Sequence, residues 1–150
     1  MLPGTDPYDL DRFLEAQAQN YEEALAELRA GRKRTHWSWY VLPQITGLGS
    51  SPMSVRYAIS GAAEATAYIH HAVLGARRLQ TVAAINAHKA LSAADILGVV
   101  DAQKFHSCVT LFAQVSTEGS PFHEALAKYF SDTPDRNTMH LLANQAKDAP

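Results

Sequence analysis

The chain has 150 residues and a mass of 16.4 kDa, the size of one ordinary domain. An apolar fraction of 47% and a charged fraction of 19% exclude a disordered or low-complexity segment. Thirteen basic and fifteen acidic residues give a net charge of −2, which excludes a globally basic binder of long nucleic acid and a polybasic membrane protein. The sequence shows no secretory signal and no apolar run of the roughly 20 residues that a span needs, so we expect a cytoplasmic protein.

Residues 9–30 predict the first helix. Apolar residues recur there at helical spacing, acidic residues fill the other face, and Asp9 is the expected N-cap. Gly31 is the expected residue beyond the helix end, followed by a basic cluster that complements the helix dipole. Residues 36–44 have no helical period, and their aromatic and β-branched content predicts a short extended or irregular segment that Pro43 ends.

The remaining chain predicts a succession of helices marked by their start signals. Ser51-Pro52 and Ser60-Gly61 start the next two, and a longer helix covers residues 73–91. Ser92 and Asp95 resemble a capping box, and Asp101, Ser120-Pro121 and Thr133-Pro134 start the last three helices.

These elements predict an all-α fold, a single compact domain over residues 1–150 with about seven helices. We expect residues 144–150 to fray. The alternative is an α+β arrangement in which residues 37–42 pair with another segment.

The first candidate site is the segment of residues 31–39. It offers cations for an anion and two indole rings for stacking or cation–π contact. Histidine exchanges protons readily near neutral pH, so His36 is a candidate acid or base. The alternative is that the tryptophans are core anchors and the cations cover a helix end. The candidate residues here are Arg32, Lys33, Arg34, His36, Trp37 and Trp39.

The second candidate site is the helix of residues 101–112. Helical spacing places Asp101, Lys104 and Ser107 on one face, while Phe105, Cys108 and Phe112 form a core stripe. The alternative is an Asp–Lys pair within the helix, with Ser and Thr hydroxyls bonded back to its carbonyls. No pair of histidines has metal-ligand spacing, and we expect neither a metal nor a cofactor.

Several segments together resemble a domain-of-unknown-function family of small, mostly bacterial helical proteins often labelled calpastatin. The likeness covers residues 6–142 and is carried by residues 6–13, 16–18, 26–34, 36–37, 43–44, 47–52 and 110–112. Ser38, Tyr40 and Leu42 depart from the family pattern Trp-Met-Trp-Phe-Val-Phe-Pro-Gln. Cys108 stands where the family has serine, which argues against a nucleophilic role. A further likeness is to NADAR proteins, which implies ADP-ribose-like ligands and N-glycosidic cleavage.

The functional hypothesis is that both segments line one pocket for a small anionic ligand, a nucleotide or an ADP-ribose-like molecule. Gln44, Ser107 and Thr110 complete the expected binding set with Lys104 and the basic segment. An N-glycosidase with Asp101 or His36 as catalytic group is the enzymatic alternative. A non-enzymatic interaction module or homo-oligomer is the third.

Overall fold

The computed structural model describes residues 5–148, and over this range the protein is all-α. The expected fold class is confirmed, with nine helices in place of about seven and no strand in the described range. A single parallel bridge joins Ile45 to Ile59. The helices are α1 (Asp11–Ala30), α2 (Ser38–Val41), α3 (Pro52–Arg56), α4 (Ala62–His70), α5 (Ala72–Asn86), α6 (Ala93–Leu97), α7 (Val99–Gln114), α8 (Pro121–Tyr129) and α9 (Arg136–Asp148).

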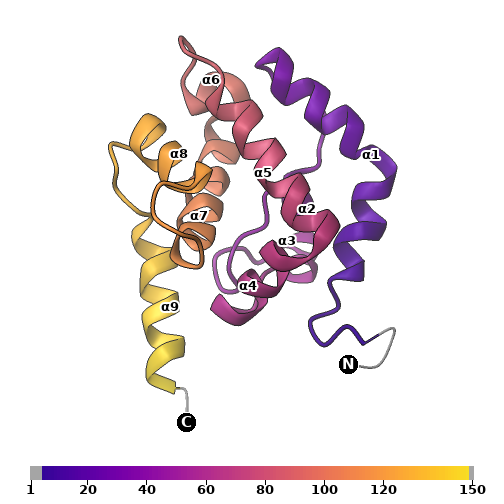
Figure 1. The fold of residues 1–150 in the computed structure, drawn as a ribbon, viewed down its shortest axis with the longest axis vertical. Coiled ribbons are helices and arrows are strands. Elements are labelled where there is room, and N and C mark those ends of the chain that lie inside the picture. Colours follow the sequence, from indigo (N-terminus) through magenta and orange to yellow (C-terminus); the bar gives the residue numbers. More distant parts are fainter. Residues whose placement is uncertain (1–4, 149–150) are drawn as a thin grey trace.

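Two helices organise the packing. Helix α5 crosses the middle of the molecule and packs against α1, α4 and α8 (Figure 1). Helix α7 lies deeper and contacts α4, α6, α8 and α9. The predicted stripe of Phe105, Cys108 and Phe112 on α7 is fully buried, which confirms it as part of the core.

Most of the predicted start and stop signals are confirmed. Ser51 and Ser120 cap α3 and α8, each with proline at the first helical position. Ser92 and Asp95 form a capping box at α6. Gly31 ends α1 with a φ of 82°, in the left-handed region that favours glycine.

Two predicted caps are wrong. Helix α1 is capped by Asp6, whose carboxylate accepts from the backbone N–H groups of Leu10 and Asp11, whereas Asp9 adopts a φ of 51° in the preceding turn. Helix α7 begins at Val99 with Gly98 as its N-cap, so Asp101 lies inside the first turn. The Asp101 carboxylate is then free to form ion pairs, which define the site described below.

The Trp-rich segment is predicted to be irregular or a short extended stretch, and for residues 38–41 this prediction is wrong. Residues 38–41 form the one-turn helix α2. Two distant side chains bond the carbonyl groups at its C-terminal end: Gln17 donates to the Tyr40 carbonyl at 2.8 Å, and the buried Arg78 donates to the Val41 carbonyl. A short helix is marginal alone, so these tertiary contacts override the local preference.

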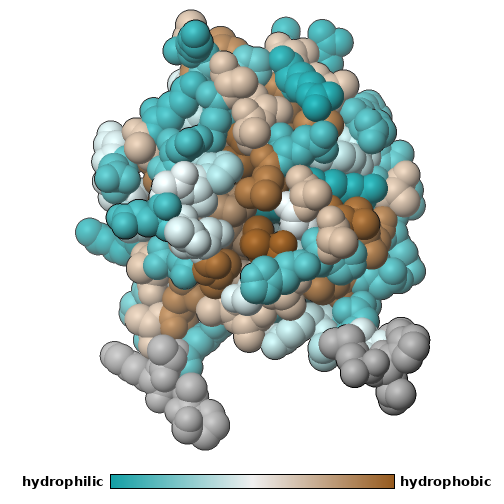
Figure 2. All heavy atoms as spheres, viewed as in Figure 1, coloured by the Kyte–Doolittle hydropathy of each residue, from teal (hydrophilic) through white to brown (hydrophobic). Residues whose placement is uncertain are grey.

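Helix α9 is continuous through residue 148, and residues 149–150 lie outside the described range. The fraying expected for residues 144–150 stays a prediction. Figure 2 shows hydrophilic surface around the edges of the view and apolar surface gathered toward the middle. No helix in the described range combines the length and the apolar character needed to cross a bilayer.

Candidate functional site

The basic segment after α1 is anchored by the Glu27 carboxylate. Glu27 accepts hydrogen bonds from the backbone N–H groups of Arg34 and Thr35, from the Thr35 hydroxyl and from the Trp37 indole, at 2.6–3.0 Å. Burial alone would raise the pKa of Glu27, but these donors outweigh it and lower the pKa to about 2. Glu27 therefore stays ionised and fixes the backbone that leads into the tryptophans.

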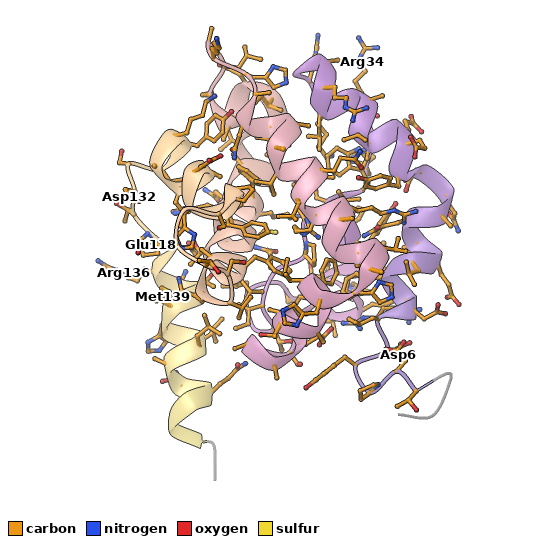
Figure 3. All side chains as sticks on the ribbon, viewed as in Figure 1. Asp6, Arg34, Glu118, Asp132, Arg136 and Met139 are labelled. Carbon is orange, nitrogen blue, oxygen red and sulfur yellow. The ribbon has the colours of Figure 1, made fainter. Side chains whose placement is uncertain are left out.

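Residues 32–37, which we call the strap, have side chains that alternate between exposed and more buried positions. This alternation is that of an extended backbone, in which successive side chains point to opposite sides. Figure 3 shows Arg34 at the outer edge of the molecule, beyond the end of α1. Arg32, Arg34 and His36 are exposed, Lys33 and Thr35 are half-buried, and Trp37 is fully buried.

The strap meets α7 through two lysines that share one carboxylate. The Lys33 ammonium lies 3.0 Å from Oδ2 of Asp101, and the Lys104 ammonium lies 3.5 Å from Oδ1. Each lysine also lies over an indole ring, Lys33 at 5.0 Å from the Trp37 centroid and Lys104 at 5.2 Å from that of Trp39. Both candidate segments therefore meet at Asp101.

The Asp101 carboxylate is held in its ionised form. Burial would raise its pKa, but Lys33, the nearby Ser38 hydroxyl and Lys104 together lower the pKa below its ordinary value. Ser38 is itself buried, and beyond its contact with the Asp101 carboxylate its hydroxyl has no hydrogen-bond partner among the described residues. The site thus combines a fixed negative charge with a hydroxyl whose oxygen is free to accept a hydrogen bond.

The two lysines differ in how strongly their ammonium groups are already bound and in how exposed they are. Lys33 donates to Asp101 and to the Thr35 carbonyl at 2.5 Å and lies over the Trp37 ring, and its side chain is only 7% exposed. Lys104 makes the longer contact with Asp101, and its side chain is 22% exposed. Lys104 is therefore the cation with donors left for a ligand.

A cavity of about 100 Å³ lies at this junction. Its lining residues are Lys33, His36, Trp37, Ser38, Trp39, Asp101 and Lys104. Lys104 and His36 thus face the same space rather than opposite sides of the domain. Trp37 has no exposed surface, so its ring acts as a core anchor, whereas Trp39 is half-buried.

Three residues of the expected binding set lie elsewhere on α7 or beside it. Gln44 donates to the Ser107 hydroxyl at 2.7 Å, and Ser107 is bonded back to the Lys104 carbonyl. The fully buried Thr110 donates to the His106 carbonyl and accepts from the backbone of Asp135. These contacts fix the segments around α7, and none of the three residues lines the cavity.

Arg32 and Arg34 also lie apart from the cavity. They line a wider surface hollow of about 490 Å³ against the C-terminal part of α1, together with Glu23 and Glu27. The two carboxylates balance the two guanidinium groups there. This hollow therefore lacks the excess positive charge that an anion site requires.

Two residues of the site, Glu27 and Ser38, have roles that the sequence does not show. Glu27 lies on the polar face of α1, where a glutamate is indistinguishable from a solvated one until the strap folds back over it. Its position near the helix C-terminus, where a carboxylate opposes the dipole, was an available signal. Ser38 was noted as a departure from the family pattern, without an assigned role.

Cys108 is confirmed as a core residue: burial raises the pKa of its thiol to about 11. Within the described residues, no group of three or more histidine, cysteine, aspartate or glutamate side chains is arranged to hold a metal ion.

Comparison with known proteins identifies the family of the chain. Residues 7–142 match the model of the family described as "Protein of unknown function (DUF1810)". The crystal structure of the conserved hypothetical protein Rv1873 from Mycobacterium tuberculosis is similar to this chain, with 47% sequence identity and a TM-score of 0.90, over 92% of this chain and 99% of that one. No curated protein matches the chain. The protein is a member of the DUF1810 family.

Proposed function

We propose that the protein binds a small anionic ligand, a nucleotide or an ADP-ribose-like molecule, at the cavity between the strap and α7. The observation that carries the proposal is the pairing in one cavity of Lys104, which has uncommitted donors, with the buried Ser38 hydroxyl, whose oxygen accepts no hydrogen bond from a described residue. A buried acceptor without a donor is costly, and a donor group of the ligand would remove that cost.

The size of the cavity limits what enters it. Its 100 Å³ corresponds to about three water molecules in the liquid, well below the volume that encloses a complete drug-sized ligand. One group of the ligand occupies the cavity, and the rest lies outside it, over the exposed His36. The cavity lining includes one carboxylate, Asp101, rather than the pair used by most glycosidases, so the geometry supports binding more directly than hydrolysis.

Replacing Lys104 by glutamine is expected to weaken the binding of ADP or ADP-ribose about tenfold or more, because a hydrogen bond from a charged donor contributes roughly 1.5–3 kcal/mol. Isothermal titration calorimetry measures the affinity, and a thermal shift that grows with ligand concentration checks it independently. Lys89→Gln is the matched control, since Lys89 is exposed and does not line the cavity. Unchanged affinity in Lys104→Gln, or no binding by the wild-type protein, would contradict the proposal.

A further inference from the structure

The charges of the cavity specify which part of a ligand enters it. Lys33 and Asp101 are the more deeply buried charges, with side chains 7% and 17% exposed, while His36 is exposed at the rim. Lys33 is engaged by Asp101 and by the Thr35 carbonyl and is the less exposed of the two lysines, so the inner part of the cavity presents mainly the Asp101 carboxylate and the Ser38 hydroxyl.

An ionised carboxylate accepts hydrogen bonds and cannot donate one. A phosphate in the inner cavity would face Asp101 at contact distance with like charge, and a ligand cation would meet Lys33 and Lys104. The group that fits is neutral, donates to Asp101 and accepts from Lys104. A hydroxyl group does both, and neighbouring hydroxyls on one ring do so together.

The walls and the volume of the cavity also suit a ring that carries hydroxyl groups. The half-buried Trp39 gives the cavity apolar surface, which suits the C–H face of a sugar ring. The volume of about 100 Å³ has room for the hydroxyl-bearing edge of a single ring and not for a base and a sugar together. The rim, where His36 is exposed and Lys104 is the more accessible lysine, is the place for the anionic group.

We infer that the cavity is a sugar-hydroxyl subsite, with Asp101 accepting from the hydroxyls of a ribose ring and the phosphate outside at Lys104 and His36. The ligand class is therefore a ribosyl phosphate, bound sugar-first. This inference rests on the proposed function and adds the orientation of the ligand and the role of Asp101 as the residue that recognises the sugar.

The experiment compares the affinities of inorganic phosphate, ribose, ribose 5-phosphate and 2-deoxyribose 5-phosphate for the wild-type protein by calorimetry. Ribose 5-phosphate is expected to bind at least tenfold more tightly than phosphate or ribose alone, and removal of the 2-hydroxyl is expected to lose part of that gain. Phosphate binding as tightly as ribose 5-phosphate would overturn the inference, because the anion alone would then fill the site.

Asp101→Asn tests the residue itself. The variant is expected to bind ribose 5-phosphate about tenfold more weakly and phosphate no more weakly than the wild type. Asp132→Asn removes the same charge from an exposed turn and is the matched control. Tighter binding of both probes by Asp101→Asn would overturn the inference, since it would place phosphate against Asp101. If Asp101→Asn does not fold, the four wild-type affinities decide.

The outcomes separate this inference from the proposed function. Binding of ADP without binding of ribose 5-phosphate leaves the proposed function standing and overturns the sugar subsite. Absence of binding by ADP, ADP-ribose and all four probes overturns both.

Discussion

Replacing Glu27 by alanine is expected to lower the free energy of unfolding by about 4 kcal/mol. The substitution leaves the indole N–H of the fully buried Trp37 and the backbone N–H groups of Arg34 and Thr35 without their acceptor. Each buried donor left unpaired costs roughly 1–3 kcal/mol. Urea denaturation measures the loss, and Glu118→Gln, at an exposed position, is the control expected to change stability by less than about 0.5 kcal/mol.

Glu27→Gln separates the charge from the hydrogen bonds. Glutamine keeps one oxygen acceptor, so we expect a smaller loss of about 2–3 kcal/mol at neutral pH. The folded pKa of about 2 lies below the ordinary value of 4.5, so the stability contributed by ionised Glu27 is present above about pH 4.5 and is lost as the pH falls toward 2. As the pH falls from about 4.5 to 2, the difference in the free energy of unfolding between the wild type and Glu27→Gln should therefore shrink toward zero. Equal losses in the alanine and glutamine variants, or a difference independent of pH, would contradict this role.

The parts of the fold that were predictable are those with local causes. Gly31, Ser51, Ser92 and Ser120 act on the helix ends beside them, so their effects are readable from neighbouring residues. Helix α2 was not predictable, because the groups that bond its C-terminal carbonyls come from α1 and α5. Secondary structure that depends on distant side chains has no local signal.

The candidate site also has features that were predictable from the sequence and features that were not. The chemistry of the two segments was visible in the sequence, and the structure brings Lys33 and Lys104 together at Asp101. Which cation has free donors was not visible, since that depends on the Thr35 carbonyl and on the two indole rings. Arg32 and Arg34 looked equivalent to Lys33 in sequence, but the alternation of the strap turns them to the other side.

A buried ion pair provides the second large effect on stability. Arg12 donates to Glu64 at 2.8 Å, and its remaining hydrogen bonds go to the carbonyls of Tyr8, Asp9, Arg56 and Ala58. Arg12→Met is expected to lower the free energy of unfolding by about 4 kcal/mol, because it leaves the 3%-exposed Glu64 as an uncompensated charge. Arg136→Met, at an exposed position, is the control in the same denaturation experiment.

The two partners should respond unequally. Glu64→Gln leaves Arg12 with its four carbonyl acceptors, so we expect it to cost about 1–2 kcal/mol, and the double variant to cost clearly less than the sum of the single ones. Equal and additive losses would show that the ion pair contributes nothing beyond local packing. Because Ile59, next to Ala58, bonds to Gln44 and Thr46, the Arg12 contacts hold the backbone that leaves the Trp-rich segment, and loss of Arg12 should loosen the site from that end.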